Sequence, residues 1–312
     1  MRIVLLGATG FVGHHLLPEL ASAGHQCLVL CRYRLGCREL ALVPRAELRQ
    51  ADVHDSAVLK EQLVGADAVI NMVGILNESG RDGKGFGRVH VELTEKLIAA
   101  CRETGVHRLL QLSALNAGQG DSHYLLSKGL AEDLIRQATD LDSTIIQPSV
   151  IFGEDDSFFN RFVSLLSMMP ALPLACPQAR LQPVWVGDVV KAMTIALEDS
   201  KTVGRTLVMV GPRDYSLKEL VEWTARTAGL KRRIVGLPDA ASRLQGRLMD
   251  FVPGKPFSSD NYRSLQIDNT STENSLWSFG IRPHSLESIV PGYLGNSIHQ
   301  GHLSRFRKQS GR

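Results

Sequence analysis

Short apolar runs alternate with amphipathic stretches along the first 210 positions of the chain. The apolar runs lie at residues 3–6, 25–31, 47–52, 68–73, 108–112, 144–147 and 206–210. The amphipathic, helix-like stretches lie at residues 14–23, 57–63, 89–103, 125–138 and 186–197. Short apolar runs are typical of parallel strands that are buried on both faces. Strands that alternate with helices predict right-handed crossovers and an α/β fold: a doubly wound, Rossmann-type parallel sheet.

The pattern changes beyond residue 210 to helical pieces separated by loops that contain proline and glycine. Helices are expected near residues 217–227, 240–250 and 286–290. We therefore predict a sheet domain at 1–210, a smaller, mostly helical substrate or lid region at 211–298 and a basic tail at 299–312. The segment at 157–185 interrupts the sheet order and is expected to contribute to the lid. Its Phe and Met side chains suit an apolar ligand cavity, although core packing is their more common fate.

Three glycines follow the first apolar run at three-residue intervals, as Gly7, Gly10 and Gly13. In a strand-turn-helix, the first permits a sharp turn, the second lets the backbone approach a pyrophosphate, and the third lets the helix pack on the strand. The N-terminus of the helix then faces the phosphates. The turn, completed by Thr9, Phe11 and Val12, thus predicts that residues 1–210 form an NAD(P)-binding domain; a tight turn without a ligand is the alternative.

The end of the second apolar run bears on the choice of cofactor. An Asp or Glu that would hold a free ribose 2′-hydroxyl is missing there, and Cys31 is followed by Arg32 and Arg34. Guanidinium groups suit a 2′-phosphate, so NADP(H) is favoured over NAD(H), unless both arginines simply face solvent. Further cofactor contacts are predicted where the third and fourth strands end, at Asp52, Val53, Asn71, Val73 and Gly74. Asp52 has the alternative of capping the following turn.

A tyrosine and a lysine stand one helical turn apart, as Tyr124 and Lys128, on the helix expected after the fifth strand. The lysine ammonium should lower the pKa of the phenol, so that the tyrosine exchanges a proton with a substrate oxygen, and it should hydrogen-bond the nicotinamide ribose. Ser113 is the candidate third member of this catalytic set. A hydroxyl is expected near position 115, where the chain has Leu115, so the set is incomplete.

A wider likeness is carried by segments at 113–117, 124–132, 147–156, 158–162, 182–189 and 210–215. Together they resemble the respiratory complex I alpha-subcomplex subunit 9 family, whose members are atypical short-chain dehydrogenase/reductases; the C-terminal third resembles bacterial stand-alone members more loosely. The resemblance implies a tightly held NADPH, used structurally in the mitochondrial relative, and a link of related proteins to ubiquinone biosynthesis. It adds Pro148 to the residues around the cofactor, which are Gly7, Gly10, Gly13, Arg32, Asn71, Ser113, Tyr124 and Lys128.

Composition narrows the remaining classes. The formal charge of +3 on 312 residues does not indicate nucleic-acid binding. Five cysteines without a CxxC pair indicate reduced thiols, neither a disulfide framework nor a metal site. No apolar run reaches the roughly 18 residues of a membrane span. We expect a cytoplasmic protein; the basic tail is either solvated or in contact with an anionic inner-membrane surface or an acidic partner.

Three functions remain open. The first is an NADP(H)-dependent oxidoreductase that acts on a hydrophobic substrate of quinone or isoprenoid type, linked to respiratory or ubiquinone metabolism. The second is a non-catalytic assembly or accessory factor that NADPH stabilises and that binds a respiratory-complex or membrane-peripheral partner. The third is an enzyme related to nucleotide-sugar epimerases, which fold similarity alone would suggest.

Overall fold

Seven parallel strands form the central sheet of the computed structural model, in the order β11-β6-β5-β4-β1-β2-β3. The strands are β1 (Arg2–Leu6), β2 (Gln26–Cys31), β3 (Ala46–Gln50), β4 (Ala68–Asn71), β5 (Arg108–Leu112), β6 (Asp142–Pro148) and β11 (Thr206–Met209). The structure describes residues 1–253 and 255–294, except for the side chains of 34–36; the predicted basic tail lies outside the described residues. The predicted doubly wound parallel sheet is confirmed, and β3 ends two residues earlier than expected.

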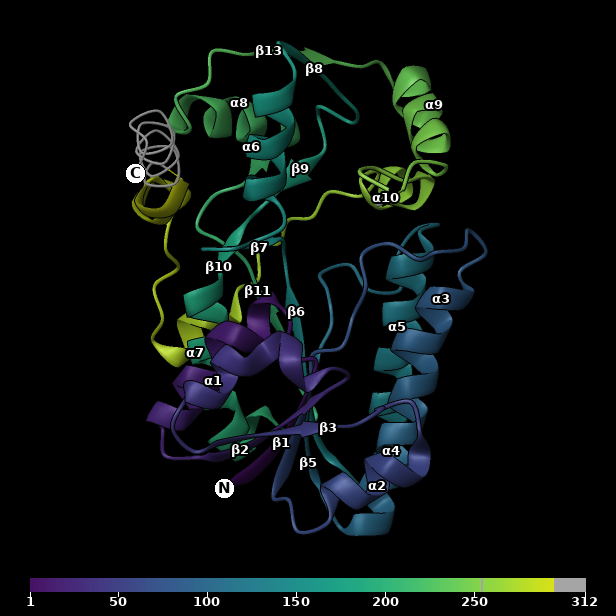
Figure 1. Cartoon of the computed structure of the whole chain (residues 1–312), viewed down its shortest axis with the longest axis vertical. Helices are drawn as coiled ribbons and strands as arrows, with labels where there is room; N and C mark the ends of the chain where they lie inside the picture. Colours follow the sequence, from purple (N-terminus) through teal and green to yellow (C-terminus); the bar gives the residue numbers. More distant parts are fainter. Residues whose placement is uncertain (254, 295–312) are drawn as a thin grey trace, which may run out of the picture.

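Helices cover both faces of the sheet (Figure 1). One face carries α1 (Phe11–Ser22) and α7 (Val186–Glu198); the other carries α2 (Ser56–Leu63), α4 (Leu93–Thr104) and α5 (His123–Gln137). Strand β1 shows how one sequence serves both layers, because successive side chains point to opposite faces. Ile3 and Leu5 join the core under α1 and α7, whereas Val4 and Leu6 join the core under α2 and α4, and all four are fully buried.

The segment between β4 and α4 differs from the prediction of one helix over 89–103. It begins with the short helix α3 (Lys84–Phe86) and continues as the π-helical turn η2 (Gly87–Glu92) before α4. Single π-helical turns are rare and occur frequently at functional sites. Three 3₁₀ segments lie elsewhere in the described chain: η1 (Arg34–Leu42), η3 (Ser200–Thr202) and η4 (Ser275–Phe279).

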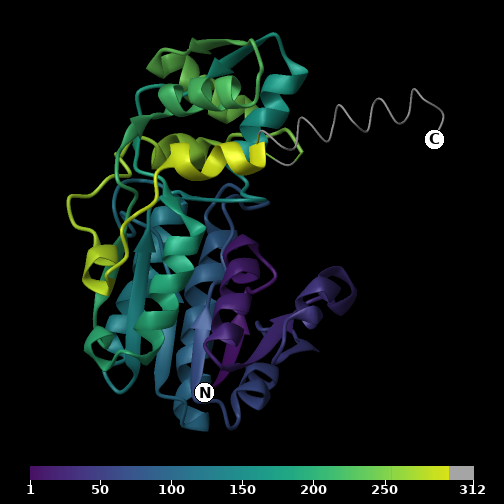
Figure 2. The same cartoon turned by 90° about the vertical axis from the view of Figure 1, so that its left-hand side faces the viewer.

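A smaller region lies beyond the carboxyl ends of the sheet strands (Figures 1 and 2). Its helices are α6 (Phe159–Met168), α8 (Leu217–Thr227), α9 (Asp239–Met249) and α10 (Ser259–Ser264), with a further helix from 286 to 294. Three strand pairs brace it: β7 (Ile151–Phe152) with β10 (Val184–Trp185), β9 (Arg180–Leu181) with β12 (Tyr215–Ser216), and β8 (Ala171–Leu174) with β13 (Arg233–Gly236). This region is less purely helical than we expected.

The 157–185 segment packs into this smaller region. Phe159 and Leu166 of α6 are fully buried with Leu220 of α8 and Val290 of the last helix. Core packing is therefore the fate of the Phe159 ring, and Met168 is exposed. The boundaries of the two predicted domains stay a prediction.

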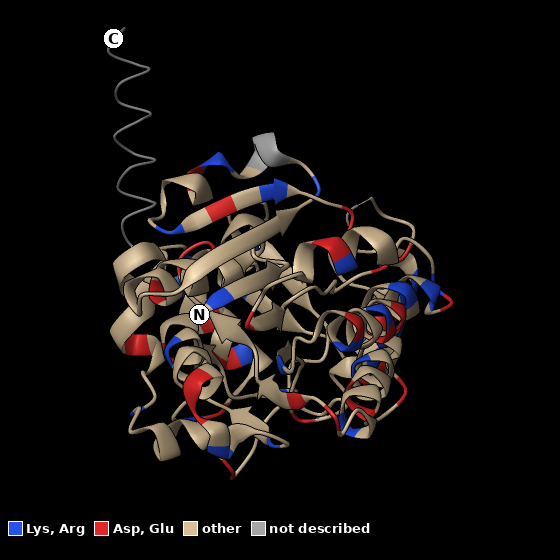
Figure 3. Cartoon of the chain, turned by 90° about the horizontal axis from the view of Figure 1, so that it is seen from below, with Lys and Arg blue, Asp and Glu red and all other residues tan. Residues whose placement is uncertain are grey.

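Positions of Lys and Arg are interspersed with those of Asp and Glu along the described chain in the view from below the sheet (Figure 3). Across the described residues, no helix is both long enough and apolar enough to cross a membrane.

Candidate cofactor and catalytic site

The glycine turn between β1 and α1 is built so tightly that side chains would not fit. Gly7 has φ +78°, and a Cβ added to it would lie 2.7 Å from the carbonyl carbon of Met72. A Cβ on Gly13 would lie 2.2 Å from the Cα of Ala8. Gly10 donates its N–H to the Gly7 carbonyl at 3.0 Å and precedes α1, whose N-terminus has no side-chain cap. The first N–H groups of α1 are therefore presented as an anion site.

The other predicted turn residues follow this cradle. Thr9 is exposed, and Phe11 and Val12 are half-buried at the start of α1. They lie beside the uncapped helix end, where a dinucleotide would approach.

Both polar atoms of the Asn71 side chain form hydrogen bonds within the protein. Its Nδ2 donates to the Oε1 of Gln111 at 2.9 Å, and its Oδ1 accepts the N–H of Val73 at 3.1 Å. Both interactions fix the bend after β4. Gly74 follows this bend, and a Cβ added to it would lie 3.5 Å from the Nζ of Lys128. The bend therefore brings the end of β4 close to α5, which carries Lys128.

The residues predicted to contact the adenine side of the cofactor differ in their exposure and contacts. Asp52 is exposed and its Oδ1 accepts the N–H of His54 at 2.9 Å, which is the turn-capping alternative. Val53 is buried beside it. Arg32 is exposed directly after β2. The side chain of Arg34 lies outside the described residues.

Ser113 carries a buried hydroxyl without a hydrogen-bond partner within the described part of the chain. Its backbone N–H donates to the Ile146 carbonyl at 2.7 Å, which fixes the residue at the carboxyl end of β5. A buried polar atom without a partner costs stability, and a ligand that hydrogen-bonds the Ser113 hydroxyl would remove this cost. Leu115, at the position expected for a catalytic hydroxyl, is buried, and its N–H donates to the Pro148 carbonyl at 2.9 Å.

Tyr124 and Lys128 lie on the first turns of α5, as predicted. The Nζ of Lys128 is buried and donates to the Leu112 carbonyl at 3.1 Å. Burial lowers the pKa of Lys128 to about 8, against the opposing field of Glu132. The prediction that Lys128 lowers the pKa of Tyr124 is wrong for this structure: burial raises the pKa of Tyr124 to about 12, because it desolvates the phenolate.

His90, in the π-helical turn, belongs to the site but was not predicted. Its Nε2 accepts the N–H of Ile75 at 3.4 Å, so its Nδ1–H donates to the Oγ of Ser127 at 2.8 Å. Burial, with a smaller contribution from Lys128, lowers the pKa of His90 to about 2, so the ring is neutral. The His90 ring packs edge-on against Tyr124, with 5.7 Å between centroids. A lone histidine in a helical stretch gives no sequence signal for this role.

Asp260 of α10, in the smaller region, caps the N-terminus of α5. Its carboxylate accepts the Oγ–H of Ser122 at 2.9 Å and the N–H groups of His123 at 2.7 Å and Tyr124 at 3.1 Å. An acidic group at a helix N-terminus satisfies its N–H groups and complements its dipole. The smaller region therefore holds the start of α5, and with it Tyr124.

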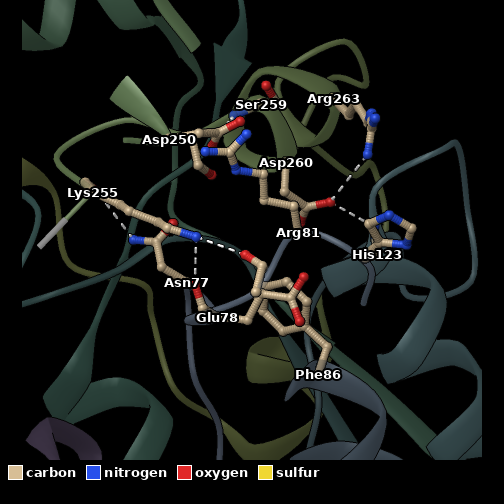
Figure 4. A pocket seen from close by; sticks show the side chains of 12 residues that line it. Asn77, Glu78, Arg81, Phe86, His123, Asp250, Lys255, Ser259, Asp260 and Arg263 are labelled. Atoms are coloured by element: carbon tan, nitrogen blue, oxygen red, sulfur yellow. Dashed lines mark hydrogen bonds and ion pairs between the residues drawn. The ribbon is translucent and has the colours of Figure 1, made fainter. Parts of the chain in front are cut away.

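A cavity of about 220 Å³ lies between the 77–86 loop, the start of α5 and α10 (Figure 4). Its lining is mostly polar. The Glu78 carboxylate accepts the N–H groups of Gly83 and Gly85, each at 2.8 Å. Lys255 donates from its Nζ to the carbonyls of Glu78 and Gly80, each at 2.7 Å. The 81–88 loop is thus fixed at its start.

Phe86 lies between this cavity and Tyr124 of α5. The ring lines the cavity and lies edge-on to Tyr124, with 6.0 Å between centroids. A group bound in the cavity would therefore be separated from the tyrosine by one aromatic ring.

Comparisons with known proteins agree with this geometry. A family described as NAD(P)H-binding matches residues 7–161. The mouse protein named NADH dehydrogenase (ubiquinone) 1 alpha subcomplex subunit 9, mitochondrial, is 28% identical over 91% of this chain and 77% of its own length. A protein of Caulobacter vibrioides named ceramide reductase is 29% identical over 80% of this chain and 77% of its own length.

Solved structures match the fold. The structure of gox2253 has a TM-score of 0.76 at 21% identity and covers 96% of this chain and 98% of that one. UDP-glucuronic acid 4-epimerase from Bacillus cereus, solved with UDP-glucuronic acid and NAD, has a TM-score of 0.69 at 16% identity and covers 95% of this chain and 99% of that one. At these identities the likeness concerns the fold alone.

Proposed function

We propose that this chain is an NADP(H)-dependent reductase of a hydrophobic carbonyl or quinone substrate, because residues 7–161 match a family described as NAD(P)H-binding and the chain resembles complex I alpha-subcomplex subunit 9 proteins. The observation that carries the proposal is the buried Ser113 hydroxyl without a partner in the described chain, at the carboxyl end of β5, where Lys128 donates to the neighbouring Leu112 carbonyl. Ligands of open α/β sheets bind at this end of the strands.

The residues present fit a dinucleotide. The uncapped start of α1 and the glycine cradle would hold the pyrophosphate, and Ser113 and Lys128 would hold the nicotinamide half. Val73, Gly74 and Pro148 would close the groove at the strand ends. When bound, the nicotinamide supplies the hydride that reduces the substrate carbon.

Tyr124 would supply the matching proton. Because burial keeps its phenol protonated at neutral pH, it is suited to donate a proton from its Oη to the substrate oxygen, which completes the reduction of a carbonyl to an alcohol. Lys128 would place the ribose and provide positive charge as the phenolate forms. The neutral His90 ring would hold Tyr124 in place.

The substrate class is proposed from the relatives. One relative is named for reduction of a ceramide, and others are named as subunits of an enzyme that acts on ubiquinone. Both names concern long apolar molecules with a polar reactive end.

The first test replaces Tyr124 with Phe. Oxidation of NADPH in the presence of long-chain carbonyl compounds and quinones should continue over many equivalents with the natural chain. Tyr124→Phe should slow turnover about 10²- to 10⁴-fold, because the proton donor is lost, while the affinity for NADPH stays nearly constant. Absorbance of the reduced nicotinamide measures the first and calorimetry the second; an unchanged rate would remove Tyr124 from this role.

The preference for NADP(H) rests on Arg32. Its guanidinium should contact the 2′-phosphate, so Arg32→Ala should weaken NADPH binding about tenfold and leave NADH binding unchanged. Arg38 is also exposed and lies further along η1, so Arg38→Ala is a matched control. Equal loss for both cofactors would show that Arg32 does not read the 2′-phosphate.

The buried Leu115 favours a second function, an accessory factor that NADPH stabilises. Such a protein would keep one equivalent of NADPH without oxidising it, would melt at a higher temperature when loaded, and would bind a respiratory-complex or membrane-peripheral partner. The turnover experiment separates the two functions, because repeated oxidation contradicts the second and tight retention without oxidation contradicts the first.

A further inference from the structure

Helix α9 is packed with its small side chains inward and its large apolar ones outward. Ser242 and Gly246 are buried against the protein, whereas Leu244 and Leu248 are 56% and 59% exposed. The two leucines are four residues apart, so they lie together on one side of the helix. An amphipathic surface helix normally buries its leucines, so this orientation leaves an apolar stripe without a partner in the described chain.

The turn after α9 extends the stripe. Phe251 is 73% exposed and Val252 is also exposed. The Arg81 guanidinium lies 3.7 Å from the centroid of the Phe251 ring, which holds the ring at the surface. We call the surface of Leu244, Leu248, Phe251 and Val252 the α9 face. Helix α9 itself lies at the outer edge of the smaller region, away from the sheet (Figure 1).

Two arginines flank the α9 face. Arg243 and Arg247 are exposed next to the two leucines. Two carboxylates of the same segment are hydrogen-bonded to α10 and keep their charge: Asp239 accepts the hydroxyl of Tyr262 at 2.7 Å, and Asp250 accepts the N–H of Ser259 at 3.1 Å. Aliphatic and aromatic groups flanked by arginine suit the headgroup layer of an anionic bilayer, where the apolar groups enter and the guanidinium groups bind phosphates.

We propose that the α9 face docks this protein on the surface of an anionic lipid bilayer. The charge pattern selects this occupant, since an acidic peptide would match the arginines but leave the four apolar side chains without a role. Phe251 stands over Arg81, which lines the cavity beside Phe86, so docking places the cavity at the membrane surface. The inference goes beyond the proposed function and does not rest on it, because vesicle binding requires no turnover.

The test is flotation of the full-length protein with phosphatidylcholine vesicles that contain about 30 mol% of the anionic lipid phosphatidylglycerol. Leu244→Ser with Leu248→Ser should reduce the bound fraction about tenfold, because the inserted apolar area is lost. Arg243→Glu with Arg247→Glu should reduce it by a similar factor on these vesicles. All variants keep the C-terminal tail, so a difference between them reports on α9.

The matched control is Leu126→Ser with Leu130→Ser, an exposed leucine pair four residues apart on α5. It should float like the natural chain, and melting temperatures should show that each variant is folded. Failure of the natural chain to float, or equal flotation of the α9 variants, or equal loss in the α5 control, would overturn the proposal. Loss of NADPH oxidation with flotation intact would count only against the proposed function.

Discussion

The two ends of strand β5 both bury a polar side chain, yet they treat it in opposite ways. At the amino end, Arg108 donates to the carbonyls of Asp142, Leu197 and Ala196 and to the hydroxyls of Thr144 and Thr202. At the carboxyl end, the Ser113 hydroxyl is buried without a hydrogen-bond partner in the described chain.

The difference separates structure from function on one element. The Arg108 guanidinium connects the end of α7 to β5 and β6. The cost of burying this charged group is offset by the hydrogen bonds that it donates within the fold. The polar groups at the other end are not offset in the same way: Ser113 lacks a partner, and burial lowers the pKa of Lys128. A ligand at the carboxyl edge would supply what the fold does not.

The largest expected effect is at the amino end. Arg108→Leu leaves the Leu197 and Asp142 carbonyls without their donor, so the free energy of unfolding should fall by roughly 4 kcal/mol. Denaturant unfolding measures this. Arg102→Leu, which removes an exposed arginine paired with Asp140, is the control and should change stability little. If both variants were equally stable, the result would contradict the structural role of Arg108 at the amino end of β5.

Replacing Lys128 should raise the free energy of unfolding, in contrast to replacing Arg108. The pKa of Lys128 is lowered on folding to about 8, so the folded protein carries a penalty that is full below pH 8 and fades as pH rises from about 8 toward 10. Lys128→Met should therefore unfold with up to roughly 3 kcal/mol more free energy at pH 7, and the gain should shrink by pH 10. NADPH affinity should fall in the same variant. A gain that stays constant with pH would show that the charge is not its source.

The smallest effect is expected at Ser113. Ser113→Ala removes a buried hydroxyl that has no partner, so the stability of the protein without cofactor should stay constant or rise by up to about 1 kcal/mol. Calorimetry should show NADPH binding about five- to tenfold weaker, which is the loss of one hydrogen bond. A clear loss of stability without cofactor would mean that the hydroxyl already has a structural partner.

Much of the site was readable from local sequence. The glycine turn, the strand ends and the Tyr124–Lys128 spacing are each set by residues close together in the chain, because a turn or a helix face is a local property. The fold class followed from the same periodicity.

The rest depends on contacts that have no local pattern. Asp260 caps α5 from 138 residues beyond Ser122, and Lys255 binds the 78–80 carbonyls from 177 residues beyond Glu78. His90 enters the site through a π-helical turn that periodicity reads as ordinary helix. The pKa of Tyr124 was predicted in the wrong direction because its spacing from Lys128 indicates proximity but not burial.

The central claim is that the carboxyl edge of the sheet is an NADP(H) site, and calorimetric titration of the natural chain with NADPH tests it most directly. We predict that one NADPH binds per chain, that it binds more tightly than NADH does, and that the NADPH-loaded protein melts at a higher temperature than the protein without cofactor. The absence of binding by either nucleotide would contradict it.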